Sequence, residues 1–281
     1  MIDGRGWGSR ILRIYLPVMG FLVLMLFPFY WMLIASIKPN RELYNAKIMP
    51  LIVYQPTLKH YYDLFADTNF LLWTYNTMLV AVITTAVSLV LGAMIAYPLA
   101  RMNFPGAAIV AVGVAATYLV PQPLLFIPMA DIINKLELGN TLSAVMLTYP
   151  TLLIPFCAWL LMGYFKSVPR ELEEAARIDG ASRFQAMWRV VLPLTVPGLL
   201  SAGIFAFTLA QNEFLYALIF LAKSEVRTVP VGAITELIRG DVFYWGQLMA
   251  AALLGSIPVA VIYSFFVDYY VAGLTAGSVK S

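Results

Sequence analysis

The sequence has little charge. Only 12% of its 281 residues are Asp, Glu, Lys or Arg, whereas 61% have apolar side chains, and the mean hydropathy is +0.81. A typical soluble domain has about 25% charged residues, so this composition excludes a soluble globular protein. It predicts an all-α protein that crosses a membrane several times. The net charge of +3 adds little, because the placement of Lys and Arg matters more than their sum in a membrane protein.

Cysteine and histidine occur once each, at Cys157 and His60. A single cysteine excludes a disulfide framework, and its position in an apolar run predicts a packed, unreactive thiol. A lone histidine cannot by itself build a metal site or a catalytic triad. We therefore interpret His60 as an exposed loop residue, and no metal site is expected.

The motifs of several enzyme classes are absent. None of the eighteen glycines is followed by lysine, so the chain lacks the loop that cradles the phosphates of ATP and is not expected to hydrolyse ATP itself. The Gly-x-Ser-x-Gly and His-Glu-x-x-His motifs are missing too, which argues against an intramembrane hydrolase. We expect a chain with no catalytic residue and no cofactor of its own.

Long uncharged runs are present instead. The first, 14–36, is long enough to cross roughly 30 Å of hydrocarbon and too long for a signal peptide. Six spans are expected, at 14–36, 73–99, 107–130, 141–165, 198–221 and 247–267. Prolines interrupt the third span, which is tolerated where a helix faces protein or a water-filled cavity. No segment looks like a detachable soluble domain, so residues 1–281 are predicted to form one transmembrane domain.

Six spans place both termini and the segment 167–197 on one side of the membrane. Ten of the eighteen Lys and Arg residues then lie on that side. They include Arg5, Arg10 and Arg13 before the first span and Lys280 near the end of the chain. Because positive residues favour the cytoplasmic side, we expect both termini and 167–197 in the cytoplasm, and the loop 223–245 outside.

The segment 167–197 is the one long polar island in the second half of the chain. Acidic residues that follow Pro169 favour a helix N-terminus, since carboxylates there complement the helix dipole. Gly180 ends this helix, and Ser182 with Gln185 has the spacing of a capping box that begins a second one. The pattern predicts two short helices joined by a tight turn, shaped to fill a groove on another protein. The alternative is a generic amphipathic surface loop.

Several polar residues lie within the fifth expected span. Ser201, Thr208, Asn212 and Tyr216 are spaced by seven, four and four residues, which predicts one stripe along a helix. Glu213 lies beside it, and a carboxylate at this depth costs about 2.5–3.5 kcal/mol on insertion scales, so it should face protein or water. The stripe predicts either a pore lining for a hydroxylated solute or a hydrogen-bond cluster with a partner helix. The residues assigned to a translocation pathway are Gln122, Thr208, Gln211, Asn212, Glu213 and Tyr216.

The segment 167–197 also resembles a known motif. Its order Glu174-Ala175-Ala176, Asp179-Gly180-Ala181 and Val190-Val191-Leu192-Pro193 is similar to the EAA loop of permease subunits in bacterial ABC importers. In that family the loop is the cytoplasmic coupling helix that docks onto the ATP-binding subunit. The resemblance implies an ATPase-coupling role for Glu171, Glu174, Ala175, Ala176, Asp179, Gly180, Ala181, Leu192 and Pro193.

Further segments are similar to the carbohydrate-importer permeases of the maltose type. They are Phe27–Met32, Ser36–Lys38, Asn76-Thr77, Ala96–Arg101, Phe104–Gly106, Gln211–Phe214, Thr228–Gly232 and Gly273–Lys280. The resemblance implies a type I ABC importer permease fold, transport of a carbohydrate or related polyol by alternating access, and a location in the bacterial inner membrane. It also implies a sister permease subunit that completes a heterodimer, two ATP-binding subunits that hold ATP and Mg, an extracytoplasmic solute-binding protein and membrane lipid. Nucleic acid is not an expected partner.

Two alternatives stay open. One is an ABC importer permease for a solute that is not a carbohydrate. The other is a secondary carrier driven by an ion gradient, which would need inverted repeats and coupling-ion carboxylates near the membrane midplane. No internal repeat is visible, and only Glu213 resembles such a carboxylate.

Overall fold

The computed structural model describes the backbone of residues 11–276 and the side chains of residues 11–267. Its chain contacts form two compact units: unit 1 comprises Met1–Phe70 with Ala233–Ile257, and unit 2 comprises Leu71–Gly232 with Pro258–Ser281. Arg5, Arg10 and the segment 277–280, which contribute to the expected topology and to the family resemblance, lie outside the described residues.

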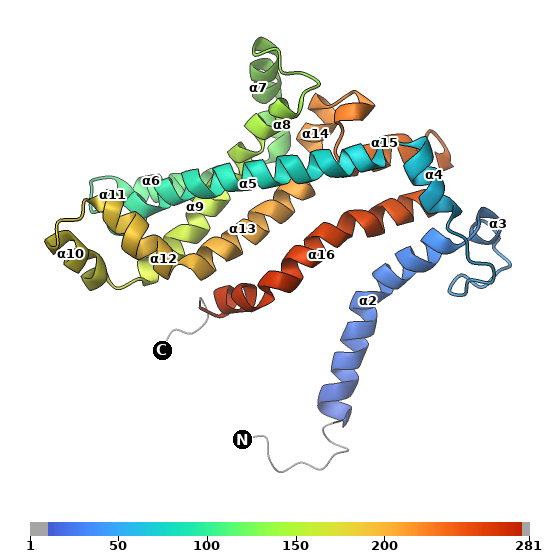
Figure 1. Ribbon diagram of the computed structural model, residues 1–281, viewed down its shortest axis with the longest axis horizontal. Coiled ribbons are helices and arrows are strands. Elements are labelled where there is room, and N and C mark those ends of the chain that lie inside the picture. Colours follow the sequence, from blue (N-terminus) through green and yellow to red (C-terminus); the bar gives the residue numbers. More distant parts are fainter. Residues whose placement is uncertain (1–10, 277–281) are drawn as a thin grey trace. The chain divides into compact units, whose positions relative to one another are not determined.

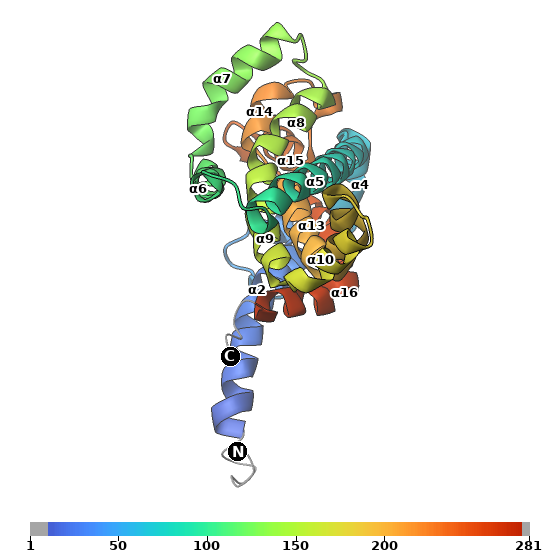
Figure 2. The same ribbon diagram turned by 90° about the vertical axis from the view of Figure 1, so that its left-hand side faces the viewer.

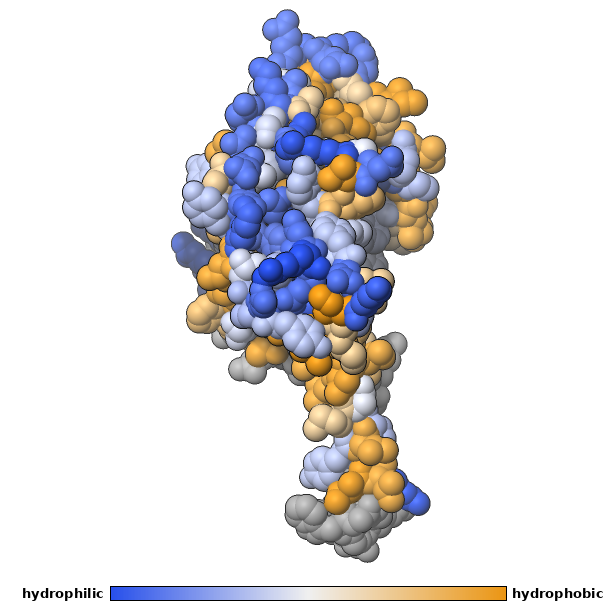
Figure 3. All heavy atoms as spheres, turned by 90° about the vertical axis from the view of Figure 1, so that its right-hand side faces the viewer, coloured by the Kyte–Doolittle hydropathy of each residue, from blue (hydrophilic) through white to orange (hydrophobic). Residues whose placement is uncertain are grey.

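Unit 1 begins with a long apolar helix. A π-helical turn, Ile11–Tyr15, leads into α2, Leu16–Ile37. Most apolar side chains of α2 are exposed, and Figure 3 shows this helix as a mainly orange column. Bare apolar surface of this extent is unfavourable in water, so α2 requires lipid or another protein around it.

The polar segment after α2 is ordered around two buried charges. It contains the short helices α3 (Asn40–Leu43) and α4 (Lys59–Asp67). Lys38 is buried and donates from Nζ to two carbonyl oxygens of the following loop, at 2.7 and 3.1 Å. Glu42 is also buried and accepts from two backbone N–H groups, at 2.9 and 3.1 Å. Because both charges are paired with backbone groups, they hold the segment compact at little desolvation cost.

His60 is buried in unit 1, contrary to the prediction. Only 5% of it is exposed, and Nε2 lies 2.8 Å from the carbonyl oxygen of Lys38. Gly246 leaves room for the ring, because a Cβ at that position would lie 2.3 Å from Nε2. The exposed-loop interpretation is wrong because the segment forms a helix, α4, that buries His60 and Leu64 one turn apart on the same face.

The expected outer loop 223–245 contains regular structure. After α15 (Val229–Leu237), strand β1 (Ile238–Arg239) pairs antiparallel with β2 (Val242–Phe243), and α16 (Trp245–Ala276) follows. The register joins Ile238 with Phe243 and Arg239 with Val242. Gly240 has φ of +59° and makes the turn, a conformation that costs glycine little.

Unit 2 is a helical bundle arranged along α5, Phe70–Arg101 (Figure 1). Its other helices are α6 (Ala107–Tyr118), α7 (Gln122–Lys135), α8 (Leu142–Thr148), α9 (Pro150–Ser167), α10 (Arg170–Ile178), α11 (Arg183–Ala186), α12 (Leu192–Leu194), α13 (Val196–Gln211) and α14 (Leu215–Phe220). A π-helical turn, Met187–Val191, links α11 to α12, and a 3-10 turn, Ser224–Val226, follows α14.

Two buried clusters form the core of unit 2. The first joins the middle of α5 to α8, α9, α13 and α14 and includes Val80, Tyr149, Phe207 and Tyr216. The second joins the end of α5 to the end of α9 and to the turn after α11, and includes Ala96, Leu161, Phe165 and Val191. Cys157 is fully buried in the first cluster, so the predicted packed thiol is confirmed. Helices α5 and α9 approach closely there, since a Cβ on Gly92 would lie 2.7 Å from that of Cys157.

Among the described residues, four helices are long and apolar enough to cross a membrane: Ile11–Ile37, Phe70–Arg101, Leu142–Ser167 and Trp245–Val267. Two bent pairs, α6 with α7 and Arg183–Leu194 with α13, bring the number to six if each is one span; their bends are 92° and 80°. The first bend is visible in Figure 2. The proline interruption expected in the third span, 107–130, is present as a break between α6 and α7. The break lies before Pro121, because proline disfavours helical backbone at the residue that precedes it.

Candidate functional site

The segment 167–197 folds as the expected helix–turn–helix. Helix α10 begins after Pro169 and carries Glu171 and Glu173 in its first turn, where they complement the helix dipole. Gly180 has φ of +90°, a left-handed conformation that favours glycine, and it turns the chain after α10. The predicted first helix and its stop at Gly180 are confirmed.

The second arm of the segment begins with a capping box. The N–H of Gln185 donates to Ser182 Oγ at 3.2 Å, and the N–H of Ser182 donates to Gln185 Oε1 at 2.8 Å. From α11 the arm continues in a helical path to Leu194. Pro193 lies in α12, directly after the π-helical turn, and has no N–H to donate to the preceding turn. The predicted capping box is therefore confirmed, and the arm is longer than one short helix.

Most of the predicted coupling residues face outward. Those exposed are Glu171, Glu174, Ala175, Asp179, Gly180 and Pro193, and those half-buried are Ala176 and Ala181. Leu192 is buried in the second cluster of unit 2. It therefore holds the arm against the bundle and does not itself present a surface to a partner.

Four exposed apolar side chains on these two arms escaped the sequence analysis. They are Leu172, Ile178, Phe184 and Trp188, and Ile178 is 86% exposed. The rings of Phe184 and Trp188 meet edge to face at a centroid distance of 6.1 Å. Exposed apolar groups among charged ones are typical of a protein-binding surface. The signal available in the sequence is the spacing of the two aromatic residues, four apart on one helical face.

A buried ion pair joins these arms to α5. Arg101, at the end of α5, donates from Nε to Glu173 Oε2 at 2.8 Å. Its side chain is 2% exposed and that of Glu173 14%. The guanidinium also donates to three carbonyl oxygens at the end of α9 and beyond, those of Phe165 (3.3 Å), Val168 (2.7 Å) and Pro169 (3.3 Å). The corner between α9 and α10 is thus fixed by one side chain from another helix.

Tyr97, one turn before Arg101, completes this contact. Its hydroxyl donates to Glu173 Oε1 at 2.6 Å and lies 3.1 Å from the carbonyl oxygen of Arg183 in the second arm. Its ring packs edge to face on Phe165 at 6.4 Å. The sequence predicts Arg101 only as one of the cytoplasmic positive charges and Glu173 only as an acidic residue near a helix N-terminus. The contact between them was not predicted, and the only signal for it was the Ala96–Arg101 segment of the family resemblance.

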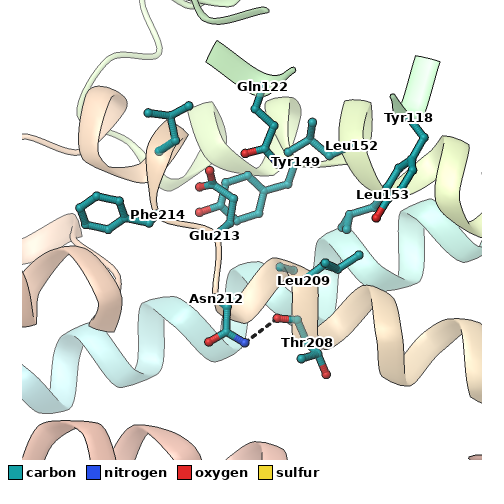
Figure 4. Close-up of a pocket in the computed structure, with 12 residues that line it drawn as sticks. Tyr118, Gln122, Tyr149, Leu152, Leu153, Thr208, Leu209, Asn212, Glu213 and Phe214 are labelled. Carbon is teal, nitrogen blue, oxygen red and sulfur yellow. Dashed lines mark hydrogen bonds between the residues drawn. The ribbon is translucent and has the colours of Figure 1, made fainter. Parts of the chain in front are cut away.

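A second candidate site is a cavity of about 420 Å³ in unit 2. Four of the six predicted pathway residues line it: Gln122, Thr208, Asn212 and Glu213. Aromatic side chains of Tyr118, Tyr149 and Phe214 line it as well. Figure 4 shows Tyr149 next to Glu213, with Gln122 at the start of α7 and Asn212 at the end of α13. Residues far apart in the sequence thus meet in one cavity.

The fifth span is not a continuous helix, so the predicted stripe is interrupted. Helix α13 ends at Gln211, and α14 begins only at Leu215. The amide of Asn212 donates to the carbonyl oxygen of Thr208 at 2.8 Å and caps the end of α13. Asn212 is exposed, whereas Tyr216 is fully buried in the first cluster. Neither Gln211 nor Tyr216 lines the cavity.

The cavity is lined by polar and by aromatic side chains. Amide, hydroxyl and carboxylate groups can hydrogen-bond hydroxyl groups, and aromatic rings offer apolar faces to a bound molecule. Among the residues that the structure describes, no group of three or more His, Cys, Asp or Glu could hold a metal ion.

Comparison with known proteins gives consistent matches. A family model described as binding-protein-dependent transport system inner membrane component matches residues 88–275, which include both candidate sites. The chain is 38% identical over 256 residues to the sulfoquinovosyl glycerol transport system permease protein SmoH of Agrobacterium fabrum, covering 91% of this chain and 89% of that protein. It is 34% identical over 261 residues to the trehalose/maltose transport system permease protein MalG of Thermococcus litoralis, covering 92% of each. The inner membrane ABC transporter permease protein YcjP of Escherichia coli is 36% identical over 262 residues, with 92% and 93% covered.

The fold also has solved counterparts. A chain of a bacterial ABC transporter involved in the import of the acidic polysaccharide alginate superposes with a TM-score of 0.77 at 21% identity, covering 95% of this chain and 99% of that one. At this identity the likeness concerns the fold alone.

Proposed function

Since the chain belongs to the family of binding-protein-dependent transport system inner membrane components, we propose that it carries a carbohydrate or sugar derivative across the cytoplasmic membrane as the spanning subunit of an ABC importer. The observation that carries the proposal is the similarity over nine tenths of the chain to permeases named for sugar-containing solutes. Transport would proceed by alternating access of a central path to the two sides of the membrane.

We propose that the surface formed by α10, its turn and α11 docks onto an ATP-binding partner. The chain has no phosphate-cradling loop, so ATP and Mg would be bound by that partner. The outward-facing carboxylates of Glu171 and Glu174 beside exposed Leu172 and Ile178 offer both charge and apolar area to a groove. ATP binding would close the partner dimer, draw the docked segments together and open the path outward.

We propose that the 420 Å³ cavity forms part of the solute path. Asn212, Glu213 and Gln122 would contact solute hydroxyl groups, and Tyr149 and Phe214 would border the path. One of the two side-chain N–H groups of Asn212 donates within α13, so the other N–H and the side-chain oxygen are available to solute. The place of Asn212 in the cavity lining favours the pore lining over the alternative of a hydrogen-bond cluster with a partner helix.

The proposal includes three partners besides solute and lipid. A sister permease subunit would cover part of the exposed apolar surface of α2. An ATP-binding subunit pair would face the cytoplasm together with both termini. A solute-binding protein would face the loop 223–245, in keeping with a structural relative solved as an alginate ABC transporter in complex with an alginate pentasaccharide-bound periplasmic protein.

The test is transport by the reconstituted complex. The chain would be co-purified with an ATPase, a sister permease and a binding protein from the same organism, and labelled trehalose, maltose and diacetylchitobiose would be offered as probes. We expect uptake of at least one sugar that requires ATP and is blocked by vanadate. Uptake that follows an imposed ion gradient and ignores vanadate would instead identify a secondary carrier.

A further inference from the structure

We propose that α5 mechanically connects the ATPase-coupling segment to the outer segment 224–229. Arg101 is the positioning residue at the inner end of this helix. The proposal rests on the proposed function, because it concerns how movement of the coupling segment reaches the rest of the subunit. It arises from side-chain contacts at the two ends of α5, those of Trp73, Asn76 and Thr77 at one end and those of Tyr97 and Arg101 at the other.

The inner fastening is made by Arg101. The guanidinium donates to the carbonyl oxygen of Phe165, in the last turn of α9, and to those of Val168 and Pro169 just beyond it. Its remaining bond reaches Glu173 in the first turn of α10. One planar cation therefore complements the negative end of α9 and a carboxylate of α10 together. Lysine, with one nitrogen, cannot reach all four acceptors.

Because the ion pair of Arg101 and Glu173 is buried, it is difficult to separate. A buried charge is costly unless it is paired, so separating Arg101 from Glu173 would leave two uncompensated charges. Tyr97 adds a bond to the same carboxylate and lies within bonding distance of the Arg183 carbonyl in the second arm. The first arm is thus bonded to the end of α5, and the second arm packs against that end through Val191 of the second buried cluster.

The outer end of α5 is fastened in a similar way. The indole N–H of Trp73 donates to the carbonyl oxygen of Ser224 at 2.8 Å. The amide of Asn76 donates to the carbonyl oxygens of Glu225 and Arg227, both at 3.0 Å. In these bonds, side chains of α5 donate to backbone carbonyl groups of the outer segment. Arg101 donates in the same way to backbone carbonyl groups at the end of α9.

Two further contacts at the outer end limit its movement. Thr77 Oγ1 accepts from the N–H of Val229 at 2.8 Å. Gly232 packs on the indole of Trp73 so closely that a Cβ would lie 2.3 Å from the ring. At 1.5 Å per residue, the helix between Asn76 and Arg101 is about 38 Å long. A single rigid element therefore joins segments on opposite sides of a membrane, and displacement of one is delivered to the other.

The test separates ATP hydrolysis from transport. Arg101→Met would be compared with Lys166→Met, which removes a positive charge from the exposed surface of the last turn of α9. In the assembled complex we expect Arg101→Met to hydrolyse ATP at no less than half the normal rate and to transport at least fivefold less solute per ATP. Lys166→Met should match the unmodified complex. Normal transport per ATP in Arg101→Met would overturn the proposal.

A second readout reports on the outer end. A fluorescent label on Lys223→Cys, exposed beside the outer segment, should change its emission when ATP binds to the complex. We expect Arg101→Met to lose most of this change, since the inner displacement no longer reaches that segment. A purely local structural role of Arg101 would leave the emission change intact, and that result would also overturn the proposal.

Two milder variants guard against loss of assembly. If Arg101→Met does not assemble, Arg101→Lys and Tyr97→Phe remove only part of the bonding, and an intermediate fall in transport per ATP is expected. Unchanged values in both would overturn the proposal. A spin label on Arg177→Cys in the chain alone, in lipid nanodiscs, should become more mobile with Arg101→Met but not with Lys166→Met. This measurement does not depend on transport. It therefore tests the contact of Arg101 with the coupling segment even if the proposed function is wrong.

Discussion

Glu213 Oε1 accepts a hydrogen bond from the backbone N–H of Tyr216 at 2.9 Å, and Oε2 accepts one from the N–H of Ala217 at 3.2 Å. The side chain therefore caps α14 immediately after the break that separates it from α13. The carboxylate of Glu213 therefore has two roles. It accepts from backbone N–H groups in the first turn of α14, and it lines the cavity.

The first prediction concerns this cap. Glu213→Ala removes both acceptors, and we expect a loss of about 1 kcal/mol in stability, as for other N-terminal caps. Glu213→Gln keeps one acceptor oxygen and should lose less. Thermal unfolding of the purified chain in detergent measures the order, with exposed Glu225→Ala as the control. Equal melting temperatures for Glu213→Ala and the control would contradict the capping role.

The second prediction concerns the solute path. Asn212→Leu removes the side-chain amide that we propose for solute contact, and transport should fall severalfold. ATP hydrolysis stimulated by the binding protein should persist, because the coupling segment is untouched. Asn134→Leu, also exposed and outside the cavity, is the matched control. A complex that falls apart with Asn212→Leu would favour the partner-helix alternative.

The third prediction concerns the turn of the coupling segment. Gly180→Ala adds a Cβ that meets nothing within 4 Å, so its effect is confined to the left-handed backbone. That conformation costs about 1–2 kcal/mol for other residues, and we expect weaker coupling of ATP hydrolysis to transport. Gly163→Ala, in helix α9 and equally open, isolates the backbone effect. Matching transport by the two variants would show that the turn is not needed.

The fourth prediction concerns docking. Trp188→Ala should weaken binding of the ATP-binding subunit by about 2 kcal/mol, roughly 30-fold in Kd, if this ring is an anchor of the interface. The monomer should keep its stability, since the ring is exposed. Trp159→Ala, on an exposed tryptophan of α9, is the control. Surface plasmon resonance measures the Kd. Equal Kd values for Trp188→Ala and Trp159→Ala would exclude Trp188 from the docking surface.

The fifth prediction concerns orientation. In spheroplasts with an intact inner membrane, a membrane-impermeant thiol reagent should label Lys223→Cys. It should label Arg177→Cys only after that membrane is opened. Both positions are exposed, so burial does not decide the result. The opposite pattern would place the coupling segment outside and reverse the expected topology.

The all-α permease fold and the family followed from the sequence, and both are confirmed. The helix–turn–helix was predictable because its signals are local: Gly180 and the Ser182 and Gln185 cap act within a few residues. Assignment of the cavity residues was partly predictable, since polar side chains in an apolar helix need a polar surrounding.

Other features depend on contacts that the sequence does not display. Arg101 and Glu173 are 72 positions apart, and only the packing of α5 on α9 brings them together. His60 is buried because distant Gly246 leaves room for it. The break after Gln211 has no proline or glycine to announce it. It forms where the side chains of Asn212 and Glu213 bond to backbone groups that a continuous helix would use.

The close approach of Gly92 to Cys157 has a practical result. The only thiol in the chain is sealed between two helices and is fully buried. Any cysteine introduced on the surface then becomes the single reactive position, without first replacing the native one. Site-directed probes can therefore report on the coupling segment and on the outer segment in a background that keeps its natural packing.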